Sequence, residues 1–523
     1  MSQTTLGKWS WLWGGGVAKA GLCQEYFAAS MALLTLFLSI RAFGKARHGR
    51  TRLPPGPRGL PLVGYLPFLG TDLHQSFTEL AQVHGPIFKL WLGSKLCVVL
   101  SSPAVIREVV RDQDGTFANR DPTVAALVYS DNANDVIFSP NGSTWRMLRK
   151  IFVREMLSKP NIDACYKLRR QEVRKIIMDV YTKVSTPIDI ACCGEEHRKE
   201  RSGVQVLELS SGAAVSAFSV LVEKPNVSDF FPLLARFDIQ GIEKETKKIS
   251  LWVDQFFDML FEQRMKGNVG TQNDQKDFVQ SLLELRDQQG PGSSITLKHM
   301  KSLLLEIQQD IVAAGTDTTS AMAEWVMGEL MRHPEVLKKV HEELTSVVGL
   351  NNVVDEFHIP KLQYLDAVLK ETHRLHPAAP FLVPRSPSQT STVGGYTIPK
   401  GSKVFVNIWA TQRDPKLWES PLKFQPERFL RNADKLDYSG NNFAYLPFGS
   451  GRRICAGLPL AERILPYVLA SFLHSFEWKL PCGTELDLSD KFGIVTKKST
   501  PLILIPTTRL PNLELYGFAV IRI

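Results

Sequence analysis

The chain has 523 residues, of which 44% are hydrophobic and 22% charged, so it can bury a large core and is not disordered as a whole. The 62 Lys and Arg exceed the 53 Asp and Glu, giving a net charge of +9 that admits nucleic acid, an anionic membrane or an acidic partner. Seven scattered cysteines without a CxxC pair argue against a disulfide-stapled secreted protein.

The N-terminal segment, residues 1–40, contains an uncharged run from Tyr26 to Ile40. A transmembrane helix needs about 20 apolar residues, so we predict a borderline anchor over about residues 21–40. A signal peptide would carry its basic flank before the apolar run, whereas here the flank follows it. The other alternative is a buried hydrophobic helix with a solvated basic tail.

The basic excess lies beside this predicted anchor. Six basic residues and no acidic residue occur between residues 41 and 58: Arg41, Lys45, Arg47, Arg50, Arg52 and Arg58. The positive-inside rule then leaves the following chain in the cytosol. Because the rest of the chain is nearly neutral, we do not expect nucleic acid as a partner.

Domain organisation follows from a proline-rich segment. Residues 53–64, LPPGPRGLPLVG, cannot form a helix and act as a stiff spacer. We therefore predict a basic and Pro-rich hinge over residues 41–64 and one large domain over residues 65–523. No internal repeat is evident.

The large domain is predicted to be mostly α with small β-sheets, an α+β fold. Strand-like runs occur at Ile87–Trp91, Cys97–Leu100 and Lys403–Ile408, and the region from about 143 to 380 is mostly helical in pattern. After Cys455 we expect one more helix and a strand-rich tail. Strands and helices do not alternate as in a doubly wound sheet, and no GxGxxG or GxxxxGK[ST] loop is present.

The most specific motif is Phe448-Gly449-Ser450-Gly451-Arg452-Arg453-Ile454-Cys455-Ala456-Gly457, which has the pattern FxxGxRxCxG. Glycines let a backbone approach a flat group closely, and the N-terminal dipole of the helix predicted after Gly457 favours a thiolate at Cys455. Arg453 is suited to bidentate pairing with a carboxylate. The alternative is a Gly-rich loop with one buried cysteine.

With this motif the chain resembles the cytochrome P450 haem-thiolate monooxygenases of the plant microsomal, membrane-anchored type, and is similar to flavonoid and terpenoid hydroxylase-like members. The resemblance runs from residue 53 to about 516. It implies haem b ligated through Cys455 as the metal ligand, and electrons from NADPH through a reductase, with cytochrome b5 as a second candidate donor. It also implies one oxygen atom of O2 inserted into a hydrophobic small molecule of terpenoid or phenolic type.

Two further motifs resemble the family's structural triad. Glu371 and Arg374 form an ExxR pair on one helical face, and Pro426–Phe429 matches the family's PERF. The resemblance implies that Glu371, Arg374 and Arg428 form a buried triad behind the haem. A lone ExxR would otherwise be an ordinary surface ion pair.

Ala314-Gly315-Thr316-Asp317-Thr318-Thr319 resembles the part of the family's long central helix that lies over the oxygen-binding face. Small Ala314 and Gly315 leave room beside a cofactor, and Asp317 and Thr318 supply an acid and a hydroxyl for proton delivery. The alternative is a plain helix whose threonines bond to preceding carbonyls.

Several residues match cofactor-binding positions of the family. Trp145 and Arg149 match WxxxR, and Arg385 lies in a predicted strand that would reach a propionate. The predicted cofactor-binding set is Trp145, Arg149, Ala314, Gly315, Arg385, Phe448, Gly451, Arg453, Cys455 and Gly457. By position only, Val124–Tyr129, Phe381–Val383 and Phe492–Val495 are expected to line the substrate pocket.

The chain departs from the family's pattern at residues 191–222, which are rich in small residues where amphipathic helices are expected. This departure keeps a non-catalytic or degenerate haem-binding protein open as an alternative. A hydroperoxide-rearranging member of the family is a second alternative, although such enzymes usually alter the Asp–Thr pair or lengthen the cysteine loop.

Overall fold

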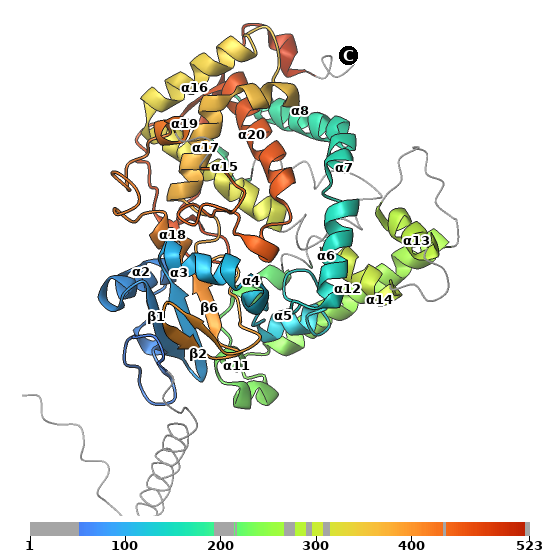
Figure 1. Ribbon diagram of the computed structural model, residues 1–523. Helices are drawn as coiled ribbons and strands as arrows, with labels where there is room; N and C mark the ends of the chain where they lie inside the picture. Colours follow the sequence, from blue (N-terminus) through green and yellow to red (C-terminus); the bar gives the residue numbers. More distant parts are fainter. Residues whose placement is uncertain are drawn as a thin grey trace, which may run out of the picture. The chain divides into compact units, whose positions relative to one another are not determined.

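The computed structural model describes residues 52–192, 214, 217–265, 278–288, 295–306, 314–431 and 436–517 (Figure 1). The chain divides into two compact units, Met1–Leu53 and Pro54–Ile523, and the second contains nearly all described residues. The predicted anchor and the hinge up to residue 51 lie outside the described residues. Across the part of the chain that is described, we find no helix with the length and hydrophobicity of a membrane span.

Helices dominate the second unit, as predicted. In chain order the helices and helical turns are η1 (Leu66–Phe68), α2 (Leu73–His84), α3 (Pro103–Arg107), η2 (Glu108–Asp112), α4 (Asp114–Phe117), α5 (Val124–Tyr129), α6 (Ser143–Glu155), α7 (Lys159–Ala164), α8 (Tyr166–Thr182), α11 (Val227–Phe230), η3 (Pro232–Phe237), α12 (Ile242–Met265), α13 (Phe278–Gln288), α14 (Leu297–Glu306), α15 (Gly315–Arg332), α16 (Pro334–Val347), η5 (Glu356–Lys361), α17 (Gln363–Leu375), α18 (Ile408–Thr411), α19 (Glu427–Arg431), η6 (Gly451–Arg453), α20 (Leu458–Ser475) and η7 (Leu513–Tyr516).

The strands form small sheets. They are β1 (Ile87–Leu92), β2 (Lys95–Leu100), β3 (Ile188–Asp189), β4 (Ser391–Val393), β5 (Tyr396–Ile398), β6 (Lys403–Val406), β7 (Phe476–Lys479), β8 (Asp490–Lys491), β9 (Lys497–Lys498) and β10 (Ile503–Thr508). One sheet has the order β1-β2-β6, with β2 antiparallel to β1 and parallel to β6, and another has the order β3-β10-β7. Pairs β4-β5 and β8-β9 complete the set, so the predicted α+β class is confirmed.

The sequence predicts a strand over Val383–Arg385, and this prediction is wrong in extent. Arg385 forms only an isolated bridge with Val404, in which each backbone N–H donates to the other residue's carbonyl at 2.8 Å. Pro384 has no backbone N–H to donate, which limits pairing along this segment. Arg385 nevertheless stays fixed beside β6.

The largest hydrophobic core joins α8, α15, α16, α17 and α20 with β7 and β10 (Figure 1). Every residue of α15 from Ala321 to Leu330 is buried, because neighbouring helices and the strand-rich C-terminal tail pack around this half of α15. Its first turns, from Gly315 to Ser320, are only partly buried. The C-terminal half of α15 is therefore fixed in the core, whereas its first turns remain partly accessible to solvent.

The departure from the family pattern at residues 191–222 is described only at Ala191, Cys192, 214 and 217–222. At its end, Phe218 is buried and its ring stacks on Tyr129 of α5 with centroids 3.8 Å apart. Stacking of this kind stabilises by about 1 kcal/mol beyond the burial of area. The end of the segment is thus packed against the domain.

Candidate active site

The cysteine loop has the close approach that its glycines predict. Gly449 and Gly451 adopt φ of +77° and +66°, a region that favours glycine. A Cβ on Gly451 would lie 2.5 Å from the carbonyl oxygen of Val110. The amide of Cys455 donates to the carbonyl of Phe448 at 2.9 Å, which closes the loop and leaves the cysteine side chain exposed.

Helix α20 begins directly after this loop. Gly457 precedes its first residue, and a Cβ on Gly457 would lie 3.8 Å from Sγ of Cys455. The first turn of the helix is therefore near the sulfur. Because the amides of a helix N-terminus carry partial positive charge, this arrangement favours the thiolate over the thiol.

Asp114 of α4 joins two parts of the site. Its carboxylate accepts from Nη1 of Arg385 at 2.8 Å, and from the backbone amide and Nη1 of Arg452 at 3.0 Å each. Arg385 also donates to the carbonyl of Ser450 at 2.8 Å. These contacts fix the cysteine loop against the segment before β6.

Four arginines gather around the loop: Arg120, Arg149, Arg385 and Arg453. Burial lowers the pKa of Arg453 to about 9, and repulsion from Arg385 and Arg149 adds to this shift. Burial also lowers the pKa of Arg120 well below its usual value, with further repulsion from the other three arginines. The guanidinium group of arginine keeps its charge in proteins, so the site concentrates positive charge.

Each arginine is held by backbone carbonyls. Arg453 donates to the carbonyls of Ala118 and Val136 at 2.8 Å each and to that of Ser139, and its guanidinium lies 4.1 Å from the ring centroid of Trp145. Nη2 of Arg149 donates to the carbonyl of Ile454 at 2.5 Å. The indole of Trp145 donates to the carbonyl of Val136 at 2.9 Å.

These residues fit a haem. Two carboxylates, Asp114 and Asp135, lie near this cluster, and Asp114 also pairs with Arg452, so the described guanidinium groups around the loop outnumber these carboxylates and favour an anionic partner that supplies negative charge. A haem carries two propionate groups, which supply that charge, and an iron that binds a thiolate. The exposed sulfur of Cys455, on a loop that glycine keeps open, is suited to that bond.

The predicted oxygen-face residues lie at the partly buried end of α15. The hydroxyl of Thr318 donates to the carbonyl of Ala314 at 2.6 Å, the back-bonding that the plain-helix alternative describes. The carboxylate of Asp317 lies 3.2 Å from Nζ of Lys497 on β9. Residues 307–313 lie outside the described residues, so α15 is described from Gly315 onward.

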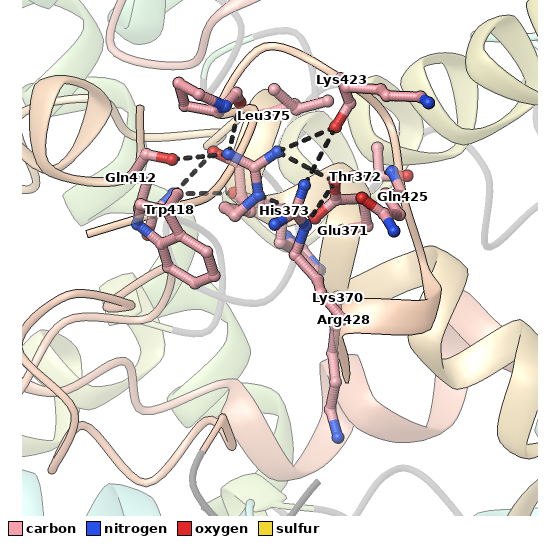
Figure 2. Close-up of polar contacts among 12 residues, drawn as sticks. Lys370, Glu371, Thr372, His373, Leu375, Gln412, Trp418, Lys423, Gln425 and Arg428 are labelled. Carbon is pink, nitrogen blue, oxygen red and sulfur yellow. Dashed lines mark hydrogen bonds and ion pairs between the residues drawn. The ribbon is translucent and has the colours of Figure 1, made fainter. Parts of the chain in front are cut away.

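Glu371, Arg374 and Arg428 lie in contact with one another (Figure 2). Arg374 makes a bidentate contact with Glu371 at 2.7 and 2.9 Å, and Nε of Arg428 donates to the same carboxylate at 3.1 Å. Glu371 and Arg374 are fully buried. Arg374 also donates to the carbonyls of Gln412 and Pro421 at 2.7 Å each.

Gln412 connects this triad to the cysteine loop. Its side-chain amide donates to the carbonyls of His373 and Arg374 at 3.0 Å each, and its Oε1 accepts from the amide of Leu446 at 3.1 Å. Leu446 stands two residues before Phe448. The triad therefore holds the start of the cysteine loop through one buried glutamine.

Among the predicted pocket residues, Phe381 is buried in an aromatic cluster with Phe77, Phe405 and Phe492, at centroid distances of 5.1 to 5.6 Å. Val383 and Ile494, in contrast, expose 38% and 51% of their surface. A cavity of about 1260 Å³ between α17 and α20 is lined by other residues, so it is not the predicted substrate pocket.

His373, which lines that cavity, gives a test of pH dependence. Burial lowers the pKa of His373 to about 4, below the unfolded value of about 6.5, so protonation favours the unfolded chain as the pH falls through this window. Protonation of this one histidine should lower the free energy of unfolding by about 2 kcal/mol between pH 7 and pH 5. His373→Phe keeps a ring against Tyr438 and Phe448.

We expect urea unfolding of the haem-loaded H373F variant to lose less stability on acidification than the parent protein, by about 2 kcal/mol. Equal losses in the two proteins would contradict this assignment.

Sequence reasoning missed three residues of the site: Arg120, Asp114 and Gln412. Each acts through contacts distant in sequence, such as the carbonyl of Val383 that accepts from Arg120 at 2.5 Å. Arg120 and Asp114 stand in segments with no other motif. The only available signal was Arg120 before Asp121-Pro122, which by itself indicates nothing.

Comparison with known proteins agrees with this geometry. The profile of the family described as Cytochrome P450 matches residues 54–193 and 207–505. A flavonoid 3',5'-hydroxylase of Campanula medium is 36% identical over 519 residues, covering 94% of this chain and 98% of the relative. A geraniol 8-hydroxylase of Catharanthus roseus is 36% identical over 513 residues, covering 93% of this chain and all of the relative.

Among solved structures, a zebra fish cytochrome P450 with progesterone superposes with a TM-score of 0.67 at 25% identity, covering 83% of this chain and 99% of that one. The fold, the relatives matched over nearly their full length and the complete cysteine loop all indicate the same family. The chain belongs to the cytochrome P450 family of haem-thiolate monooxygenases.

Proposed function

We propose that this protein hydroxylates a hydrophobic phenolic or terpenoid molecule. The observation that supports it most is the full-length similarity to hydroxylases of flavonoids and of geraniol. Exposed apolar side chains at Val383 and Ile494 suit such a substrate. The electron donor is an NADPH-dependent reductase, with cytochrome b5 as a second donor.

Each site residue has a role in this proposal. Cys455 ligates the haem iron, and the haem when bound supplies the oxygen chemistry, which thiolate donation favours. Arg120, Arg149, Arg385 and Arg453 would hold the propionates, and the ring of Trp145 packs against the guanidinium of Arg453. Phe448, Gly451 and Gly457 shape the loop around the sulfur.

Proton handling is assigned to α15. Ala314 and Gly315 keep its first turn small, while Asp317 and Thr318 place a carboxylate and a hydroxyl on consecutive residues. The hydroxyl of Thr318 must leave the carbonyl of Ala314 to donate elsewhere, and threonine's second χ1 rotamer allows this. Asp317 can then carry protons between solvent and this hydroxyl.

The proposal includes the predicted organisation: a membrane anchor within residues 1–40, a hinge over 41–64 and a catalytic domain over 65–523. The basic residues after Ile40 support an endoplasmic reticulum anchor with the catalytic domain in the cytosol. Extraction tests this arrangement. Extraction of the full chain from membranes should need detergent, whereas salt alone should release from membranes a chain that starts at residue 53.

The test of function is a substrate titration followed by turnover. The haem-loaded protein is titrated with geraniol and with a flavanone, and binding is followed in the haem absorption spectrum. We expect one compound to bind and to gain one oxygen atom from labelled O2 when reductase and NADPH are present. Binding without turnover would indicate the degenerate alternative, and activity on a hydroperoxide without reductase would indicate rearrangement.

A further inference from the structure

The hairpin β8–β9 contacts the end of α15 through one ion pair. Nζ of Lys497 lies 3.2 Å from Oδ1 of Asp317, and these side chains are 50% and 45% exposed. Nothing in the sequence motifs indicates this contact, because 180 positions separate the two residues. Lys497 is thus the described cation that pairs with the carboxylate assigned to proton handling.

The hairpin itself is too short to hold its own position. It has only two cross-strand pairs, Asp490 with Lys498 and Lys491 with Lys497. The second pair places two lysines directly opposite, which destabilises a strand pair. A two-stranded hairpin is marginal in water even when longer, so its placement depends on contacts with the rest of the domain.

Those contacts attach the hairpin to two helices. Nε2 of His74 on α2 lies 3.0 Å from the carboxylate of Asp490, and the indole of Trp325 on α15 donates to the carbonyl of Thr496 at 3.3 Å. The Lys497–Asp317 pair is a second attachment to α15. It also relieves the repulsion between Lys497 and Lys491.

The loop between the strands, Phe492–Val495, belongs to the predicted substrate wall. Its exposed Ile494 stands three residues before Lys497, so the loop and β9 are joined by one short turn. Asp317 lies at the other end of the ion pair. One contact therefore connects a predicted substrate-facing loop to the predicted proton-handling carboxylate.

We propose that Lys497 is a positioning residue that fixes the Asp317 carboxylate and the Phe492–Val495 loop relative to each other, so that substrate seating and proton delivery are coupled. The inference rests on the proposed function. Because coupling between two sites is reciprocal, a ligand that shifts the loop changes the Lys497–Asp317 contact, and loss of that contact changes ligand affinity.

The first measurement needs no turnover. The haem-loaded full-length protein is labelled briefly with acetic anhydride, and acetylation of each lysine is quantified by mass spectrometry. We expect Asp317→Asn to raise labelling of Lys497 about two- to fivefold, the range for loss of an exposed ion pair, and to leave Lys491 unchanged. Equal labelling of Lys497 in both proteins would overturn the contact.

The second measurement compares Lys497→Met with the matched control Lys491→Met. Lys491 is exposed on the same hairpin and forms no ion pair within the described residues. We expect K497M, but not K491M, to weaken spectral binding of whichever of geraniol or a flavanone binds and to lower product formed per NADPH. K497R, which keeps the positive charge, should retain the spectral binding and the product formed per NADPH of the parent protein.

A merely structural role for Lys497 would change the melting temperature without changing product per NADPH, and that outcome would overturn the coupling. Failure of the proposed function is separate. It would appear as absent turnover in the haem-loaded parent protein, while the labelling result would still report on the ion pair.

Discussion

The Cys455→Ala variant is expected to lose completely the absorption band that reduced, thiolate-ligated haem gives with carbon monoxide. The physical reason is that no other described thiol lies on a glycine-opened loop beside four arginines and a helix N-terminus. The arginine cluster should still attract haem, so residual haem without the thiolate band is compatible with this expectation. Difference spectroscopy of the purified protein measures it.

The control is Cys482→Ala, which removes another exposed cysteine after β7 and should keep the band at full intensity. Retention of the band in C455A would contradict the assignment of the ligand. Loss of the band in both variants would show that general misfolding explains the result.

Replacing Arg374 with alanine is expected to destabilise the domain by about 3–5 kcal/mol. The substitution removes the bidentate partner of the fully buried carboxylate of Glu371, which keeps only Arg428 as a cation, and leaves the carbonyls of Gln412 and Pro421 without their donor. Since a domain is stable by about 5–15 kcal/mol, we expect low accumulation and a much lower urea midpoint.

A matched control is Lys248→Ala, which breaks an exposed i,i+3 ion pair with Glu245 on α12 and should cost under about 1 kcal/mol. If R374A does not accumulate, Arg428→Ala provides the measurement, because Glu371 then keeps its bidentate partner. We expect the urea midpoint of R428A to lie between those of R374A and K248A. Equal midpoints for R428A and K248A would contradict a buried triad.

The sequence predicted the elements whose signal is local. The cysteine loop, the ExxR helix and the helix-dominant fold could be predicted because glycine spacing and helical periodicity act over a few residues. Arg385 was predicted as a site residue but placed in a strand, because a single bridge to Val404 has no periodicity to reveal it.

Residues that act across the fold could not be predicted in this way. Asp114 binds Arg385 and Arg452, which are 271 and 338 positions away, and Gln412 reaches both α17 and Leu446. Neither residue type is unusual in its own segment. Their roles arise only when tertiary packing brings three separate segments together.

The arginine cluster has a consequence for how the protein matures. A chain that folds before it is loaded must hold these four guanidinium groups close together, while Asp114, one of the two carboxylates near them, is shared with Arg452. The cofactor's two negative charges remove that repulsion, so loading and folding support each other thermodynamically. The amount of mature protein in a producing cell should therefore follow the supply of haem more closely than the rate of translation.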